Sequence, residues 1–388
     1  MEQESQNLSE ILFKPKFNYP ETSVISNSGC PLPELSREDL MFENTPGSRP
    51  ELFDTVSEYG SGHWTYEFCS IAQRRFNLAN KCVENSDPAG ASHHYRLAAR
   101  YFSIAAYPYL KSDVLADNAE VLCRTAYRKM FEIDSTIGIL QEHSFEVDGK
   151  KVSGYLHLPD LSQVYPCIVL LCNYESSIST HYRDVTKLLK EHQIAVFVIE
   201  MPGAGGCERL NLNDHMSAVV ESSLDYLASL KYVDSANLGI MGIGISGTSC
   251  IRASVMKPDA IKAMALTVPF VHSFFTSREI LNSLPLCLRS SLCNRLDLDA
   301  SSWDLVIPRL KVFSLKEQGI LSSSRRSRIP TLVNIYENSV VTKEDLQILE
   351  NNFQDLTVNT GKASMGLAQF TLDSMQKITE FFVRHFSS

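Results

Sequence analysis

The spacing of hydrophobic positions changes near residue 138. Between residues 61 and 135, apolar residues recur three and four positions apart, as at Leu97, Tyr101 and Ala105. Pro108 interrupts this pattern, because proline cannot continue a helix. The pattern therefore predicts consecutive helices in a small N-terminal helical domain.

After residue 138 the pattern predicts strands instead. Short apolar runs, many of them β-branched, alternate with helix-like stretches up to residue 388. Such alternation is typical of an α/β domain, in which helices cover both faces of a mostly parallel sheet. Asp148 and Gly149 join the first two runs and predict a hairpin, so the sheet should begin with an antiparallel pair. The predicted strands are 139–147, 152–158, 166–172, 194–199, 238–242, 261–267 and 331–335.

Two segments depart from these patterns. Residues 1–60 contain six of the 16 prolines and are expected to form an extended arm. Between residues 270 and 328 the alternation gives way to a serine- and leucine-rich helical texture. We expect a cap-like insertion there, over the carboxyl edge of the sheet, with an apolar cavity beneath it.

Composition narrows the classes of function. The chain has 388 residues, 44% of them hydrophobic, and a net charge of −9, which argues against nucleic acid as a partner. No apolar run approaches the ~20 residues that span a bilayer, and residues 1–6 do not resemble a secretory signal, so a cytoplasmic location and no membrane contact are expected.

The ten cysteines lack a C-x-x-C pair and are expected to be buried thiols, without metal. The glycines of residues 203–206 lack dinucleotide spacing, and no cofactor is expected.

Residues 238–249 run from a buried strand into a helix and look like a nucleophile elbow. In this turn the nucleophile is flanked, two positions away on each side, by small residues. Centring the elbow on Ser246 supplies a nucleophile but places Thr248 at a flank. Centring it on Gly244 gives the small flanks Gly242 and Ser246 but leaves no nucleophile. The predicted strand leads directly to Gly242, which favours Gly244 as the centre.

Longer strings along the chain carry a resemblance to a known family. The sequence resembles the fermentation/respiration switch protein (FrsA) family, regarded as esterases. The resemblance implies an α/β-hydrolase fold for residues 138–388 and again aligns Gly244 with the elbow centre, where that family need not have serine. The matching strings are residues 7–17, 103–111, 201–202, 233–234 and 269–272.

The resemblance also indicates where the other catalytic residues should lie. The triad acid is expected after the strand 331–335, where Ser339 occupies its position and Glu337 is the nearest carboxylate. The base is expected in the loop before the last helix, but residues 359–366 contain no histidine. The triad is therefore predicted to be degenerate.

The oxyanion hole is also weakened. Its amides should follow the strand that ends at Cys172 and the nucleophile itself, which places them near Asn173 and Gly247. Active hydrolases often have glycines in the first loop, whereas Asn173 and Tyr174 would narrow the space.

Other residues could supply chemistry from unusual places. His272 follows the strand 261–267 and is the best-placed histidine, although a structural role is favoured. Asp214 and His215 could act as an acid and a base, but Asp214 is favoured as the cap of a helix that starts near Met216. Cys207 is a candidate thiol, with a plain buried cysteine as the favoured alternative.

Two functions compete. The favoured one is a non-catalytic or very weakly active protein that uses the fold for binding or regulation. The alternative is a carboxylesterase that hydrolyses small carboxylic esters with Ser246 as nucleophile. A small ester or another apolar molecule is the expected ligand, and the resemblance implies the glucose-specific IIA component of the phosphotransferase system as a protein partner.

Overall fold

A computed structural model describes residues 64–387 except residues 108, 111–112, 175, 285, 299–302 and 322–325. The extended arm predicted for residues 1–60 lies outside these described residues.

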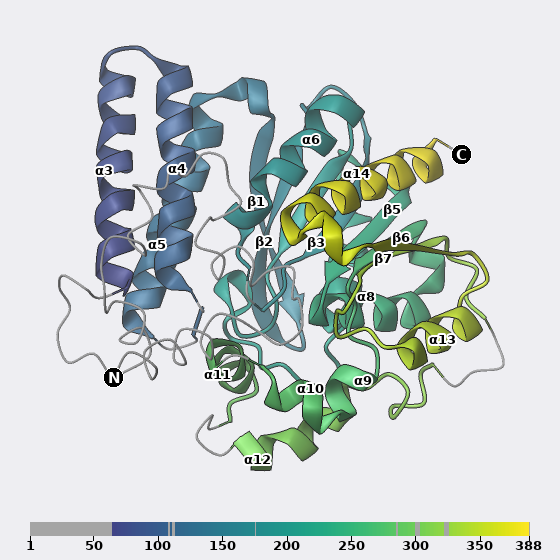
Figure 1. Cartoon of the computed structure of the whole chain (residues 1–388). Coiled ribbons are helices and arrows are strands. Elements are labelled where there is room, and N and C mark those ends of the chain that lie inside the picture. Colours follow the sequence, from purple (N-terminus) through teal and green to yellow (C-terminus); the bar gives the residue numbers. More distant parts are fainter. Residues whose placement is uncertain are drawn as a thin grey trace, which may run out of the picture.

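The N-terminal helical domain contains helices α3 (Trp64–Glu84), α4 (Pro88–Ala106) and α5 (Val114–Ile133). Asp87 caps α4 by accepting a hydrogen bond from the Gly90 amide, and Pro88 occupies the first turn, where its missing amide costs nothing. Asp113 caps α5 in the same way. Helix α4 packs between α3 and α5, and the three stand beside the β1–β2 end of the sheet (Figure 1).

The second domain has the α/β architecture that the sequence predicts. Its described residues form an eight-stranded sheet in the order β1-β2-β4-β3-β5-β6-β7-β8. Strands β1 and β2 form the predicted antiparallel hairpin, with Asp148 and Gly149 at φ 49° and 71° in its turn. Strand β2 is also antiparallel to β4, and the remaining pairs are parallel. The strands are β1 (Ile139–Val147), β2 (Lys150–Leu158), β3 (Tyr165–Leu171), β4 (Ala195–Ile199), β5 (Val233–Ile243), β6 (Ala263–Thr267), β7 (Thr331–Tyr336) and β8 (Leu356–Gly361).

Strand β8 was not predicted from the sequence, which left residues 359–366 as a loop. The strand pairs with β7 along its whole length and is the last strand of the sheet. It contains two threonines, an asparagine and a glycine, and most of its side chains are partly or fully exposed. The apolar run that marks a buried strand is therefore absent from an edge strand of this kind.

Helices cover both faces of the sheet. Helix α14 (Leu367–Phe386) packs with α6 (Tyr182–His192), and α7 (Ala218–Leu227) packs with α8 (Ile245–Met256). Helix α13 (Lys343–Asn352) connects β7 to β8. Short 3₁₀ helices are η3 (Ser135–Ile137), η4 (Ile178–His181), η5 (Gly205–Cys207), η6 (Pro258–Ala260) and η9 (Ala363–Met365).

The predicted insertion lies between β6 and β7, at one end of the sheet (Figure 1). Phe275 packs at its centre, in contact with the rings of Phe274 and Phe313. Its helices are α9 (Ser273–Thr276), α10 (Arg278–Asn282), α11 (Leu286–Arg295), α12 (Trp303–Val306) and η8 (Ile307–Phe313). Among the described residues, no helix is both long and apolar enough to cross a membrane.

Candidate functional site

The strand-to-helix turn is centred on Gly244. Strand β5 ends at Ile243, α8 begins at Ile245, and Gly244 between them has φ 57° and ψ −122°. This φ/ψ region is sparsely populated because it is strained for any residue with a side chain. A strained backbone at the central residue is usual in a nucleophile elbow. The structure thus has the register that the strand length favoured, and glycine stands where a nucleophile would be.

The neighbouring glycines allow close packing around the turn. A Cβ atom on Gly242 would lie 2.7 Å from the backbone carbonyl of Ser246, and one on Gly247 would lie 2.9 Å from Pro269 Cβ. Both separations are too short for a real side chain, so β5, α8 and the segment after β6 can approach this closely only with glycine at these positions.

The Ser246 hydroxyl is used inside the turn. Its Oγ accepts a hydrogen bond from the Ile243 amide at 2.7 Å and donates one to the Ile243 carbonyl at 2.8 Å. The side chain is 0% exposed. Ser246 therefore closes the turn between strand and helix, and its hydroxyl does not face a pocket.

Two side chains fill the space in front of Gly244. A Cβ atom at residue 244 would lie 3.1 Å from Asn173 Nδ2 and 3.3 Å from Phe270 Cζ. Both side chains are buried, and the Phe270 ring stacks on Phe274 with ring centres 3.7 Å apart. A substrate carbonyl would have to occupy the volume that Asn173 and Phe270 now fill.

The amides considered for an oxyanion hole already have partners. The Asn173 amide donates to Ser176 Oγ at 2.9 Å, and the Gly247 amide donates to the Gly244 carbonyl at 3.1 Å. The Cys172 amide bonds to the Ile199 carbonyl within the sheet. The structure therefore does not support the oxyanion hole that sequence reasoning placed at Asn173 and Gly247.

In the loops where the triad acid and base were expected, the candidate residues make hydrogen bonds that hold the loops in place. The Ser339 amide donates to the Tyr336 carbonyl, closing the turn after β7. Glu337 is exposed and accepts a hydrogen bond from the Ala363 amide at 2.9 Å, which ties it to the loop after β8. That loop, residues 362–366, forms η9 and has no histidine.

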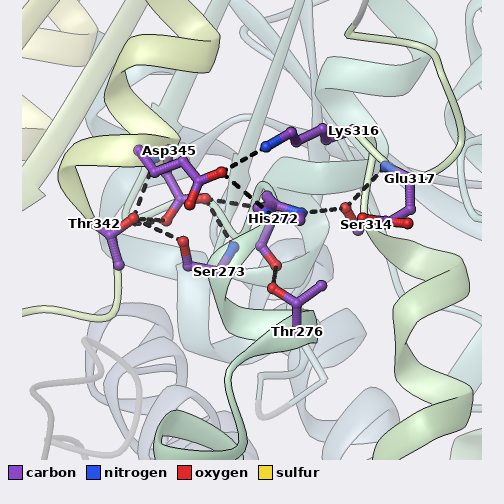
Figure 2. Close-up of polar contacts among 9 residues, drawn as sticks. His272, Ser273, Thr276, Ser314, Lys316, Glu317, Thr342 and Asp345 are labelled. Carbon is purple, nitrogen blue, oxygen red and sulfur yellow. Dashed lines mark hydrogen bonds and ion pairs between the residues drawn. The ribbon is translucent and has the colours of Figure 1, made fainter.

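His272 is buried at the start of the insertion and turns its ring toward that region (Figure 2). Its Nδ1 lies 2.8 Å from Ser314 Oγ, and its Nε2 lies 3.6 Å from Glu344 Oε1. Glu344 in turn accepts a hydrogen bond from Lys316 at 2.6 Å, which lowers the pKa of Glu344. The backbone amide of His272 donates to Asp345. The contact with Ser314 lies within the insertion, and the contacts with Glu344 and Asp345 join the insertion to α13. His272 therefore has a structural role in packing the insertion and holding it against that helix.

Asp214 and His215 are exposed residues of the loop before α7. The prediction that Asp214 caps a helix starting near Met216 is wrong. Helix α7 begins at Ala218 with Ser217 at its N-cap position, and the Ser217 hydroxyl donates to Glu221 instead. An N-cap side chain binds the amide of the second or third helical residue, here Val219 or Val220. Four residues, 215–218, separate Asp214 from Val219.

Cys207 is fully buried in η5. Burial and the nearby Glu200 carboxylate raise the pKa of its thiol well above the ordinary value. Because the thiolate is the nucleophilic form, this environment suits an inert buried cysteine.

Sequence reasoning missed a cluster of charged residues, here called the buried charge cluster, that is formed by Glu120, Arg124, Glu200 and Arg295. Glu200 and Arg295 are buried, whereas the side chains of Glu120 and Arg124 are partly exposed. Glu120 and Arg124 pair at 3.2 Å on α5, Glu200 follows β4, and Arg295 ends α11. The Glu200 carboxylate accepts the Gly206 amide at 2.8 Å. The cluster therefore joins the helical domain, the carboxyl edge of the sheet and the insertion.

Arg295 is the most unusual member of the buried charge cluster. Its side chain is 0% exposed, and Nη1 donates to the Tyr109 carbonyl at 3.3 Å and to Ser291 Oγ at 3.0 Å. Within the described residues, its Nε and Nη2 atoms have no hydrogen-bond partner. Burial lowers the pKa of Arg295 to about 10, against the opposing effect of Glu120. Burial and the neighbouring Glu200 carboxylate raise the pKa of Glu120.

The space beside this cluster is small. Glu120, Arg124 and Glu200 line a cavity of about 10 Å³, which has room for a single water molecule. None of the residues that line it belongs to the insertion, so this cavity is not the apolar cavity expected beneath residues 270–328, which stays a prediction. From sequence, only the four-residue spacing of Glu120 and Arg124 was visible, and such pairs are usually exposed.

The sheet order and the sharp turn after β5 define a protein of the α/β-hydrolase fold. The sequence profile described as "Esterase FrsA-like" matches residues 37–383, and the chain belongs to this family. It is 28% identical to Esterase FrsA of Yersinia pestis (strain Pestoides F) and of Yersinia pseudotuberculosis serotype O:1b (strain IP 31758), in each case over 90% of this chain and 92% of the relative.

Solved structures show the same fold. One is the 2,6-dihydroxy-pseudo-oxynicotine hydrolase, with a TM-score of 0.70 and 16% identity over 91% of this chain and 93% of that chain. Another is AbyA5, with a TM-score of 0.65 and 16% identity over 86% of this chain and 92% of that chain. These similarities extend over the helical domain as well as the sheet.

Proposed function

We propose that this FrsA-like chain does not carry out serine hydrolysis and uses its α/β-hydrolase fold for binding or regulation. The observation that carries this proposal is the glycine at the centre of the elbow. Gly244 has no side chain to attack a carbonyl, and Asn173 and Phe270 fill the volume in front of it. Fast ester hydrolysis by a serine mechanism requires a nucleophile, a base and room for the acyl group together.

The other contacts at the site support the same proposal. The nearest serine, Ser246, holds its hydroxyl against the Ile243 backbone. The loop after β8 provides no histidine, and the His272 ring is engaged by Ser314. A serine far from any base keeps its proton and remains a weak nucleophile.

The alternative proposal is a carboxylesterase that acts on small esters. The family profile bears the description of an esterase, which favours this activity at the level of the family. In this chain Ser246 would have to break both hydrogen bonds to Ile243 and turn toward a base, with His272 or His215 as the candidates. The glucose-specific IIA component stays a prediction as a regulatory partner.

The decisive experiment measures hydrolysis of p-nitrophenyl acetate by the purified full chain. We expect the wild type to be at background and Ser246→Ala to be indistinguishable from it. Gly244→Ser is expected to remain inactive because no histidine in residues 362–366 can accept its proton. Ser249→Ala is the matched control, since Ser249 is a buried serine of the same helix.

Turnover that is lost in Ser246→Ala and kept in Ser249→Ala would establish the carboxylesterase instead. Losing a true nucleophile reduces turnover by several orders of magnitude, whereas background hydrolysis by surface groups changes little. Covalent labelling of the wild type, but not of Ser246→Ala, by a fluorophosphonate would support the same conclusion.

A further inference from the structure

A wide cleft lies at the end of the sheet opposite the elbow. It is found where β6 and β7 begin and where α8 and α13 end, whereas the elbow follows the end of β5. The volume of the cleft is about 930 Å³. Clefts that bind small molecules commonly measure ~300–1,000 Å³. This cleft therefore has room for a ligand, unlike the cavity of about 10 Å³ beside the buried charge cluster.

Part of the lining of the cleft is apolar. Leu321, Ile329 and Phe353 are buried beside it, and Val255 of α8 lines it with 38% of its surface exposed. The lining named here excludes residues 322–325, which lie outside the described residues. Apolar lining of this kind stabilises a bound hydrocarbon or aromatic group, because such a group is then removed from water.

The charged side chains of the lining are mainly basic. Lys262, Arg326 and Arg328 line the cleft. Among the described lining residues, the one acidic side chain is that of Asp259. This local excess of positive charge contrasts with the net charge of −9 of the whole chain. Positive charge that is gathered in a cleft with apolar walls attracts anions.

Two of these basic side chains can pair with a ligand. Arg326 is already engaged, because its Nη2 donates to the carbonyls of Glu350 and Phe353 at the end of α13. Within the described residues, the side chains of Lys262 and Arg328 make no hydrogen bond or ion pair. Carboxylate and phosphate groups accept charge-assisted hydrogen bonds from lysine and arginine. Lys262 and Arg328 are therefore suited to hold such a group.

We propose that this cleft binds a small amphiphilic anion, whose carboxylate or phosphate group pairs with Lys262 and Arg328 and whose apolar part lies against Val255, Ile329 and Phe353. An inorganic anion would leave the apolar lining uncovered, and a neutral apolar molecule would leave both cations without a partner. A fatty carboxylate and an alkyl phosphate share the required chemistry. The cleft is separate from the elbow, so the proposal does not depend on whether the chain hydrolyses esters.

The first test is a fluorescence titration of the full chain with 8-anilinonaphthalene-1-sulfonate, an aromatic molecule with one anionic group. We expect saturable binding to the wild type. The double variant Lys262→Gln, Arg328→Gln should weaken binding at least about tenfold, because charge-assisted hydrogen bonds are lost. Arg309→Gln, Lys311→Gln is the matched control: it removes the same charge from two exposed side chains of the insertion and should leave binding unchanged.

A neutral probe separates the anionic group from the apolar part. N-phenyl-1-naphthylamine lacks the sulfonate, so its binding to the wild type should be weaker and should be the same in Lys262→Gln, Arg328→Gln. Val255→Asn should weaken the binding of both probes, because it removes apolar area from the lining. Val121→Asn is the control for this variant, since Val121 is a 61% exposed valine of α5, and it should change neither affinity.

Competition identifies the class of anion. Octanoate and octyl phosphate carry the same hydrocarbon chain with different anionic groups, and octan-1-ol carries it without charge. At least one of the two anions should displace the sulfonate probe, and the one that does so at the lower concentration distinguishes a fatty carboxylate from an alkyl phosphate. Octan-1-ol should displace it much less effectively than that anion.

Thermal unfolding of each variant checks that it is folded. The absence of saturable binding to the wild type overturns the proposal. An equal loss in Lys262→Gln, Arg328→Gln and in its control overturns it too, because general charge attraction then explains the binding. Displacement by octan-1-ol as effective as that by the anions shows that the anionic group is not recognised, and it has the same consequence.

Discussion

The elbow and the buried charge cluster lie at the same edge of the sheet and have opposite character. At the elbow, Gly244 is surrounded by Asn173 and Phe270, and the Ser246 hydroxyl is satisfied by backbone. In the cluster, Arg295 is wholly buried with two of its nitrogens unpartnered among the described residues. The place where a hydrolase performs chemistry is closely filled here, and the ionisable groups are buried at a junction between regions.

This difference teaches that the elbow can be closely packed while ionisable groups remain buried at the same edge of the sheet. Close packing at the elbow stabilises the fold there, since the turn needs glycine and a satisfied hydroxyl. Buried charges have the opposite effect on stability unless each one is balanced, because desolvation costs several kcal/mol per ion. The predictions below therefore compare changes in the cluster and around it with changes at the elbow.

Removal of Arg295 should have the largest effect of any single substitution. Arg295→Met is expected to lower the free energy of unfolding by about 3–5 kcal/mol, because it leaves the Glu120 and Glu200 carboxylates with Arg124 as the one remaining cation of the cluster. Urea unfolding measures this loss, which should be greater at pH 8 than at pH 6, since the raised pKa of Glu120 keeps more of it neutral at the lower pH. Arg309→Met, at an exposed arginine of the same insertion, is the control and should change little.

If Arg295→Met is as stable as the wild type, the guanidinium does not balance the cluster and the contrast with the elbow disappears. Adding Glu120→Gln to Arg295→Met should recover part of the loss, because one of the uncompensated charges is then removed.

Acid should weaken the contact between the helical domain and the sheet. His157 contacts Tyr127 of α5, and His181 lies in η4; burial lowers the pKa of each to about 4. The unfolded chain, with a histidine pKa near 6.5, takes up protons that the folded chain excludes. The stability that these neutral histidines provide is complete above about pH 6.5 and is lost as the pH falls toward 4, by about 3 kcal/mol for each histidine.

Unfolding free energies between pH 7.5 and 4.5 test this dependence. In the double variant His157→Gln, His181→Gln the decrease over this interval should be much smaller than in the wild type. His215→Gln changes an exposed histidine and should retain the full decrease. An unaltered slope in the double variant would show that other groups control acid unfolding.

At the elbow, a side chain at residue 244 should cost less than a lost charge in the cluster. Gly244→Ala is expected to lower stability by about 1–3 kcal/mol, from positive φ together with contacts to Asn173 and Phe270. Gly366→Ala is a matched control: it also has a positive φ, of 78°, but its new Cβ would meet no atom within 4 Å. Equal losses in the two variants would mean that the space at the elbow is not filled.

Ser246→Ala should have the smallest effect, a loss of about 1 kcal/mol, because it leaves the Ile243 amide without its acceptor. Ser249→Ala removes a buried hydroxyl that has no partner among the described residues, and it should be neutral or slightly stabilising. Thermal unfolding of the two variants side by side measures the difference. The reverse order of stability would contradict the assigned role of the Ser246 hydroxyl.

Much of the fold followed from local pattern. The hairpin at Asp148 and Gly149 and the buried strands such as β3 were predicted, because buried parallel strands are continuous apolar runs. Strand β8 was missed because an edge strand need not be apolar. The cap role of Asp214 was wrong, since residues with a propensity for capping are also common in ordinary loops.

The sequence by itself determined that residues 238–249 form an elbow and favoured Gly244 over Ser246 as its centre, because strand length and small-residue spacing are local features. The structure has Gly244 at the turn. Only the tertiary structure decided what surrounds that turn. Asn173 and Phe270 meet at Gly244 from different loops, and Arg295 interacts electrostatically with Glu120 and Glu200 from a distant part of the chain. Contacts between residues so far apart in the chain depend on how the sheet, the helical domain and the insertion pack, and no local spacing encodes them.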